Sequence, residues 1–174
     1  MNASILKKIF VPDSHKLSAH EVYIKLVNQA RNPFFFQECG VSDTLDGRFD
    51  VIVLHLFLLT RRLKNNSPEF LRAIWEVFFS DMDRSLREMG ASDTGIGKRI
   101  KKMAQAFYGR IDAYEKTLAD EAAFRESIIR NLYREVAVDE EKVSALIAYV
   151  TGNLECLQKQ DISAITSGDL RFCD

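Results

Sequence analysis

Residues 46–64 restrict the fold of this chain more than any other segment. Their apolar side chains recur at three- and four-residue spacing, which predicts a helix, and they cover almost every side of it. One face carries Phe49, Ile52, Val53, Leu56, Leu59 and Leu63, and another carries Val51, Leu54 and Leu58. A helix that is apolar all round has to be buried. We therefore expect the rest of the chain to surround a central core helix.

Similar apolar stripes run through residues 22–30, 71–89, 96–118, 124–132 and 143–157. Ser18 stands three residues before Glu21, a capping-box pattern that predicts the start of the first helix. Ser67 and Pro68 predict another start, and Gly90 predicts an end. No segment alternates as a strand would.

These patterns predict an all-α fold, a compact single-domain bundle of six to seven helices with a buried central helix near residues 46–64. We expect residues 1–16 to form an N-terminal extension, residues 17–160 a helical domain, and residues 161–174 a C-terminal tail.

Composition excludes several classes of protein. A net charge of −1 argues against a surface built for DNA. No apolar run approaches the roughly 20 residues of a transmembrane helix, and the N-terminus lacks a signal-peptide core. The cysteines Cys39, Cys156 and Cys173 are odd in number and widely spaced. This predicts no disulfide framework, no zinc site, and a reducing compartment such as the cytoplasm.

Catalytic signatures are missing as well. The chain contains no H-E-x-x-H and no G-x-S-x-G motif, and the glycines near Lys98 lack the other residues of a phosphate loop. We predict no enzyme activity, no metal site and no cofactor. His55 reads first as a core histidine bonded to a neighbour, with a contact to a ligand or partner as the alternative.

The loop that leads into the central helix is unusually polar. Asp43, Thr44 or Asp46 can cap this helix, and Gly47 allows close packing. Capping does not explain Arg48, because a cation opposes the dipole at a helix N-terminus. We expect Arg48 to be partly buried and bonded to one of the aspartates.

Two clusters of charge have both a structural and a functional interpretation. Lys98, Arg99, Lys101 and Lys102 form either a solvated helix face or a surface for an acidic partner, an anionic membrane or ribosomal RNA. Asp83 with Arg87, and Arg84 with Glu88, are spaced as ion pairs along a helix.

Three blocks of this sequence together resemble the ubiquinol–cytochrome c chaperone family. The blocks are residues 41–56, residues 81–90, and residues 97–114, in family order and spacing. The resemblance covers residues 35–149, with weaker matches at residues 130–131 and 168–170. Ser42 replaces a proline that many relatives carry.

The resemblance implies a helical, non-enzymatic chaperone. Mitochondrial members bind newly made cytochrome b near the ribosomal exit, with a small partner protein, and pass it on for assembly of ubiquinol–cytochrome c reductase. The chain has no transit-like presequence, so a bacterial member at the cytoplasmic face of the inner membrane is expected. The alternative is a helical adaptor that binds a soluble partner and has no membrane client.

The residues expected to bind the client or partner are polar or aromatic and lie in or near these blocks. They are Phe35, Phe36, Asp43, Asp46, Arg48, Asp50, His55, Asp83, Arg84, Glu88, Lys98, Lys102, Tyr108 and Arg110, with Phe34 and Phe79 if they are exposed.

Overall fold

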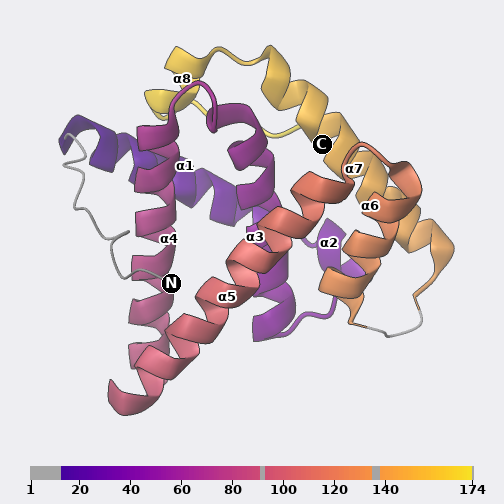
Figure 1. Cartoon of the computed structure of the whole chain (residues 1–174), viewed down its shortest axis with the longest axis horizontal. Helices are drawn as coiled ribbons and strands as arrows, with labels where there is room; N and C mark the ends of the chain where they lie inside the picture. Colours follow the sequence, from indigo (N-terminus) through magenta and orange to yellow (C-terminus); the bar gives the residue numbers. More distant parts are fainter. Residues whose placement is uncertain (1–12, 91–92, 135–137, 174) are drawn as a thin grey trace.

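Helix α3 (Leu45–Leu63) occupies the centre of the molecule, with the other helices arranged around it (Figure 1). The computed structural model describes residues 13–90, 93–134 and 138–173. Along these residues the remaining elements are α1 (Asp13–Ala30), α2 (Phe34–Gln37), α4 (Pro68–Glu88), α5 (Asp93–Thr117), α6 (Glu121–Ile128), a π-helical turn η1 (Ile129–Tyr133), α7 (Glu140–Lys159) and α8 (Ile162–Thr166).

The predicted fold class is confirmed. Six of the α-helices in the described residues have eight residues or more, and no described residue lies in a strand. Helix α3 packs against α1, α4, α5, α7 and η1. Its side chains are buried along most of its length, and Ile52 is a partly exposed exception among the apolar ones. Even so, no helix in the described ranges has the length and apolar content of a membrane span.

Most of the predicted helix boundaries are also confirmed. Thr44 caps α3 by accepting a hydrogen bond from the Gly47 backbone amide at 3.1 Å. Pro68 opens α4, and Gly90 follows its end with a φ of 78°, a conformation that glycine adopts without strain.

The predicted start of the first helix at Ser18 is wrong. Helix α1 begins at Asp13, so Ser18 lies inside it. Tertiary packing gives the reason, because the His15 ring, near the start of α1, packs edge-on against Phe70 of α4 at 5.7 Å between centroids. Of the predicted N-terminal extension, residues 1–12 lie outside the described residues.

His55 is a core histidine, as its setting in an apolar helix predicts. The ring is fully buried, with Nδ1 2.8 Å from the Val51 carbonyl and Nε2 2.8 Å from the Tyr149 hydroxyl. A carbonyl can only accept a hydrogen bond, so Nδ1 donates and Nε2 accepts from Tyr149. Gln29 of α1 donates to the same hydroxyl at 3.2 Å, which links three helices through one polar chain.

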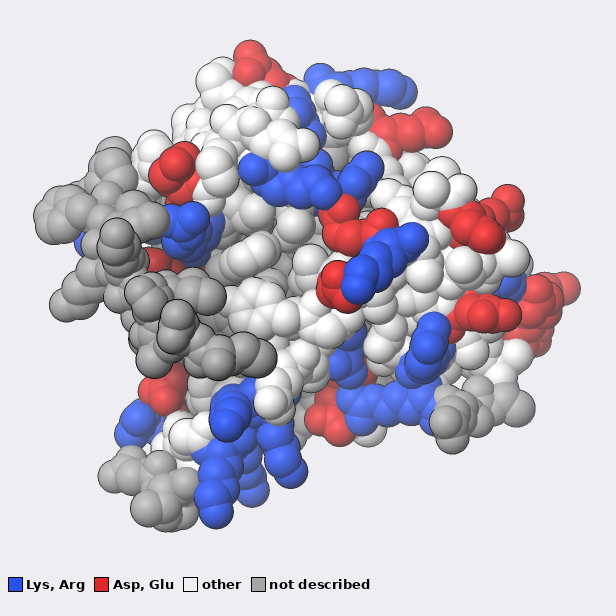
Figure 2. Space-filling view, viewed as in Figure 1, with Lys and Arg blue, Asp and Glu red and all other residues white. Residues whose placement is uncertain are grey.

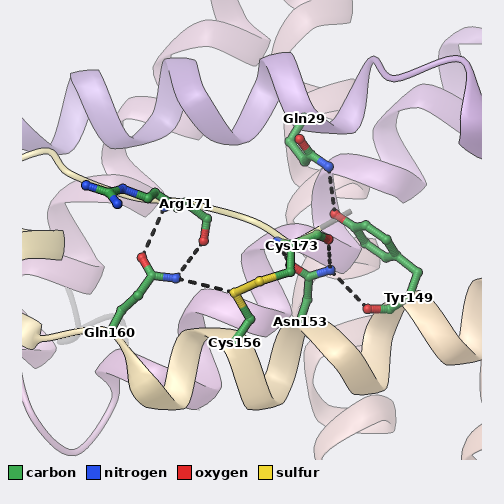
Figure 3. Close-up of a disulfide and its surroundings, with 7 residues drawn as sticks. All are labelled: Gln29, Tyr149, Asn153, Cys156, Gln160, Arg171 and Cys173. Atoms are coloured by element: carbon green, nitrogen blue, oxygen red, sulfur yellow. Dashed lines mark hydrogen bonds between the residues drawn. A yellow bond between two sulfur atoms is a disulfide. The ribbon is translucent and has the colours of Figure 1, made fainter.

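The C-terminal residues fold back along α7 and form a disulfide that the cysteine number and spacing did not predict. Cys156 and Cys173 form a disulfide, with 6.2 Å between their Cα atoms (Figure 3). Their wide separation in sequence gave no hint of it, because only the fold of the tail brings them together. Cys39 is free and buried.

Other contacts hold the same tail. The Asn153 side chain exchanges two hydrogen bonds with the Cys173 backbone at 2.8 and 2.9 Å, and the Gln160 side chain does the same with Arg171. Phe172 packs edge-on against the His55 ring. In a reducing compartment the disulfide would open to two thiols, and these contacts would still hold the tail.

Acid should destabilise the protein through His55. Burial lowers the pKa of this ring to about 4, below its usual value of 6.5. Between these two pH values the His55 ring is protonated in the unfolded chain and neutral in the folded chain. Stability is therefore lost as pH falls from 6.5 towards 4. We expect His55 to contribute a loss of about 2 kcal/mol between pH 7.5 and pH 5.

The measurement is urea unfolding of the wild type and of His55→Gln at both pH values. The wild type should lose about 2 kcal/mol more than the variant, while the opposite effect of groups common to both proteins cancels. Equal losses in the two proteins would contradict the prediction.

Candidate functional site

An open groove lies where the start of α3, the end of α4 and the first half of α5 meet. Its cavity volume is about 530 Å³. We call it the α3–α4–α5 groove and define it by its lining. The apolar lining residues are Leu45, Phe49, Ile52, Met82, Leu86, Met89, Met103 and Ala106. The polar lining residues are Asp46, Arg48, Ser85, Arg99, Lys102, Arg110 and Arg134.

The groove is a mostly apolar surface that the fold leaves uncovered. Leu45 and Met89 on its edge have exposed fractions of 71% and 52%. Three methionines line it, and their unbranched, polarisable side chains adapt to differently shaped apolar partners. A concave apolar surface with a polar edge is the usual form of a peptide- or ligand-binding site.

A tight loop positions the α3 edge of this groove. Gly47 lies in the first turn of α3, directly against the loop, where an added Cβ atom would stand 1.9 Å from the Ser42 carbonyl oxygen. Only glycine allows this approach. The loop backbone is therefore held against the helix, and Leu45 and Asp46 reach the groove from that turn.

Asp50 is the buried charge of the site. Its carboxylate is fully buried one turn into α3, with Oδ1 2.8 Å from the Arg110 guanidinium and Oδ2 2.9 Å from the Arg134 guanidinium. Arg134 also binds Asp46 at 2.7 Å. Arg110 lies 5.6 Å from the centre of the Phe49 ring, a cation–π distance. These contacts tie α3, α5 and the end of η1 together beneath the groove.

Burial dominates the protonation of Asp50. It raises the pKa of this carboxyl to about 6, because loss of water outweighs the opposing effect of Arg110 and then Arg134. Buried ion pairs of this kind add little net stability but fix geometry when every partner is present.

Arg134 was not predicted from the sequence. It follows the π-helical turn and has a φ of 51°, a left-handed conformation that is uncommon for arginine. This conformation lets its side chain bind both Asp46 and Asp50. No glycine or asparagine marks the position, so the sequence carries no signal for it.

Arg48 binds an aspartate as predicted, but it is exposed rather than partly buried. It makes two hydrogen bonds to Asp43, at 2.6 and 3.2 Å, and both side chains are about half exposed. Its guanidinium lies 5.9 Å from the centre of the half-buried Phe36 ring. The Arg48–Asp43 pair joins α3 to the loop that precedes it, on the solvent-exposed side of the helix.

The basic residues of α5 extend from the groove to the solvent. Lys98, Arg99, Lys101 and Lys102 are all exposed, and Figure 2 shows basic side chains gathered over the first turns of this helix. Arg99 and Lys102 line the groove, whereas Lys98 and Lys101 do not.

Several other predicted residues lie away from the groove. Phe35 and His55 are fully buried in the core, so they expose no surface to a partner. Asp83 binds Arg87 as predicted, but Arg84 binds Asp81 instead of Glu88. Tyr108 is exposed on α5 and packs against Trp75 and Phe79 of α4.

The lining residues that were not predicted from the sequence share one property. Met82, Met89 and Met103 belong to the apolar stripes of α4 and α5, and stripes of this kind predict core positions. All three line the groove between α4 and α5, two helices that diverge from the turn that joins them (Figure 1).

His55 does not contribute to the groove. Its ring is enclosed in the core, and it does not line the groove beside Asp46 and Arg48. Among the described residues, no three His, Cys, Asp or Glu side chains gather as metal ligands do.

A second groove of about 560 Å³ runs between α1 and α4. Arg84 lines it, together with the hydrogen-bonded pair Tyr23 and Asp81, whose oxygens are 2.9 Å apart. It holds fewer large apolar side chains and no methionine, so it is a weaker candidate for binding an apolar segment.

The chain is similar to known proteins of one family. Residues 37–172 match the family model described as ubiquinol-cytochrome C chaperone. The chain is 25% identical to ubiquinol-cytochrome-c reductase complex assembly factor 1 of Xenopus laevis, over 84% of this chain and 75% of that protein. It is 23% identical to the human protein of the same name, over 84% of this chain and 50% of that protein.

A solved structure shares the fold. The crystal structure of the Cbp3 homolog from Brucella abortus superposes with a TM-score of 0.81 at 34% identity. The match covers 92% of this chain and 91% of that chain. The chain spans about half the length of the mouse and human relatives, 55% and 50%.

Replacing Gly47 by alanine should destabilise the fold by about 3 kcal/mol, because the new methyl group overlaps the Ser42 carbonyl and pushes the loop away. Gly97→Ala is the matched control. No described heavy atom lies within 4 Å of a Cβ there, so we expect a gain of about 0.5–1 kcal/mol. Urea unfolding checks both values, and similar stability changes in the two variants would contradict this account.

Removing Arg134 should raise the pKa of Asp50 above about 6, because the buried carboxylate then keeps Arg110 as its one close cation. The measurement is a carbon-13 NMR titration of the Asp50 carboxyl in the wild type and in Arg134→Gln. Arg48→Gln is the control, because Arg48 binds Asp43 and should leave the Asp50 pKa unchanged. An unchanged titration in Arg134→Gln would refute the proposed ion-pair network.

Proposed function

This chain belongs to the ubiquinol–cytochrome c chaperone family, and we propose that it binds newly made cytochrome b during biogenesis of the ubiquinol–cytochrome c reductase. The family acts in assembly of this complex and is not an enzyme family. The specific client, cytochrome b, is our proposal for this chain.

The observation that carries the proposal is the α3–α4–α5 groove. Transmembrane segments must be shielded from water until they are inserted, and this requires an apolar surface that accepts different side chains. The groove offers such a surface through Met82, Met89 and Met103. Its volume of about 530 Å³ suits a few apolar side chains from one face of a helix.

The ion-pair network beneath the groove supports this role. Asp50, Arg110 and Arg134 hold α3, α5 and the end of η1 in a fixed relation beneath the groove. A binding site that is already shaped loses less entropy when its ligand arrives. We infer that the network preorganises the groove for the client.

We further propose that the protein works in the cytoplasm, peripheral to the inner membrane of a bacterium. Lys98 and Lys101 are exposed, do not line the groove, and suit an anionic surface, either the membrane or ribosomal RNA. Such a surface would hold the chaperone near the place where its client is made.

Polar substitution in the groove should reduce assembly of the reductase. In a deletion strain that expresses Leu45→Gln/Met89→Gln, we expect membrane cytochrome b and haem b to fall at least about threefold relative to the wild type, because the groove loses apolar contact area. Both side chains are exposed, so folding should be unaffected. The readout is the haem b spectrum and cytochrome b level of the membranes.

Leu17→Gln is the matched control. Leu17 has an exposed fraction of 67% on α1 and lines neither groove, so this variant should restore normal cytochrome b. Crosslinking from position 89 should also capture cytochrome b. Intact cytochrome b in the deletion strain itself, with crosslinks to soluble proteins alone, would favour an adaptor and sink the proposal.

A further inference from the structure

The charges around the α3–α4–α5 groove are strongly unequal in sign. One lining residue, Asp46, is acidic, and five are basic: Arg48, Arg99, Lys102, Arg110 and Arg134. A net positive groove attracts negatively charged ligands and repels basic ones.

Three of the five cations already have carboxylate partners within the protein. Arg48 binds Asp43, while Arg110 and Arg134 bind the buried Asp50. Arg99 and Lys102 differ, because within the described ranges neither forms an ion pair or a side-chain hydrogen bond. Among the described residues, the groove therefore presents two unpaired positive charges on one wall.

These two cations lie directly beside the apolar floor. Arg99 and Lys102 are three residues apart on α5 and thus on one face of the helix, and both are exposed. Met103 and Ala106 continue the same lining further along α5. A ligand that fills the floor with apolar side chains would bring its flanking residues within reach of both cations.

We propose that the α3–α4–α5 groove selects an apolar helix that carries carboxylates next to its apolar stripe, and that Arg99 and Lys102 are the specificity-determining residues that bind these carboxylates. The inference rests on the client-binding function proposed above and narrows the client to a chemical class. Basic segments of the same hydrophobicity would be rejected.

The shape of the site favours a helix over a membrane surface. The apolar surface is concave, and a hollow cannot be inserted into a flat bilayer, whereas a helix fills it. Lys98 and Lys101 lie on the same helix outside the groove, where a flat anionic surface could reach them. Arg99 and Lys102 are therefore assigned to a helical ligand, and Lys98 and Lys101 to a flat anionic surface.

The expected preference is modest and sensitive to salt. Each exposed charge pair contributes a few-fold in affinity, and salt at physiological strength screens charges beyond about 8 Å. With two pairs formed, we expect about fivefold tighter binding of an acidic helix than of a neutral helix with the same apolar face.

The test uses the full chain and three designed 18-residue helical peptides, measured by fluorescence anisotropy. All three carry leucines at three- and four-residue spacing, which form one apolar stripe. The stripe is flanked by two glutamates in the first peptide, two glutamines in the second and two lysines in the third. We expect affinity to fall from the glutamate to the glutamine to the lysine peptide. In Arg99→Gln/Lys102→Gln the glutamate peptide should bind only as well as the glutamine peptide.

Lys98→Gln/Lys101→Gln is the matched control, with the same change in net charge on the same helix. It should keep the fivefold preference. Equal affinity of the wild type for the glutamate and glutamine peptides overturns the proposal, and so does an equal loss of preference in both double variants. Binding to phosphatidylglycerol vesicles that requires Arg99 and Lys102, with no peptide binding, overturns it in favour of the membrane.

Failure of this inference differs from failure of the proposed function. If position 89 crosslinks to cytochrome b but the peptides show no charge preference, the charge selection alone is wrong. If the deletion strain keeps normal cytochrome b, the client assignment fails whatever the peptides show.

Discussion

The burial of most of α3 is the constraint on which the rest of the structure depends. Thirteen of its nineteen residues are buried, including all the apolar side chains of its two faces except Ile52. Each large apolar side chain removed from water contributes about 1.5–3 kcal/mol, so the surrounding helices must close around it. Three polar side chains are buried with it, and each has a partner: His55 binds Val51 and Tyr149, Thr60 donates to the Leu56 carbonyl, and Asp50 binds two arginines.

The middle and the start of α3 have different surroundings, and this difference creates the candidate site. The middle of the helix, near His55, is packed against α7 and the C-terminal tail. Near its start, Phe49 and Ile52 line the open groove. There α4 and α5 diverge from the turn that joins them (Figure 1). Burial of Asp50 beneath this opening requires guanidinium partners, and those partners come from α5 and from the end of η1. At the groove the apolar packing is thus incomplete, but the ion pairs of Asp50 hold α3, α5 and the end of η1 together.

Charge around the groove follows from the same arrangement. Arg110 and Arg134 neutralise Asp50, so they belong to the structure of the site as much as to its surface. Arg99 and Lys102 have no such internal role within the described residues. That distinction separates the cations that shape the groove from those that remain available to a partner, and the sequence alone could not draw it.

Local patterns in the sequence determined most of the helices, the cap at Thr44, the helix start at Pro68 and the central position of α3. Each of these depends on residues within one helix or its flanking turns. The family followed from three separate blocks, each of them a local pattern. Tertiary structure decided the rest: the methionine-lined groove, the partners of Asp50, the left-handed Arg134, and the Cys156–Cys173 disulfide. The disulfide joins residues 17 positions apart, and the Asp46–Arg134 ion pair joins residues 88 positions apart. A local pattern cannot specify which distant side chains the packing of α3 will bring together.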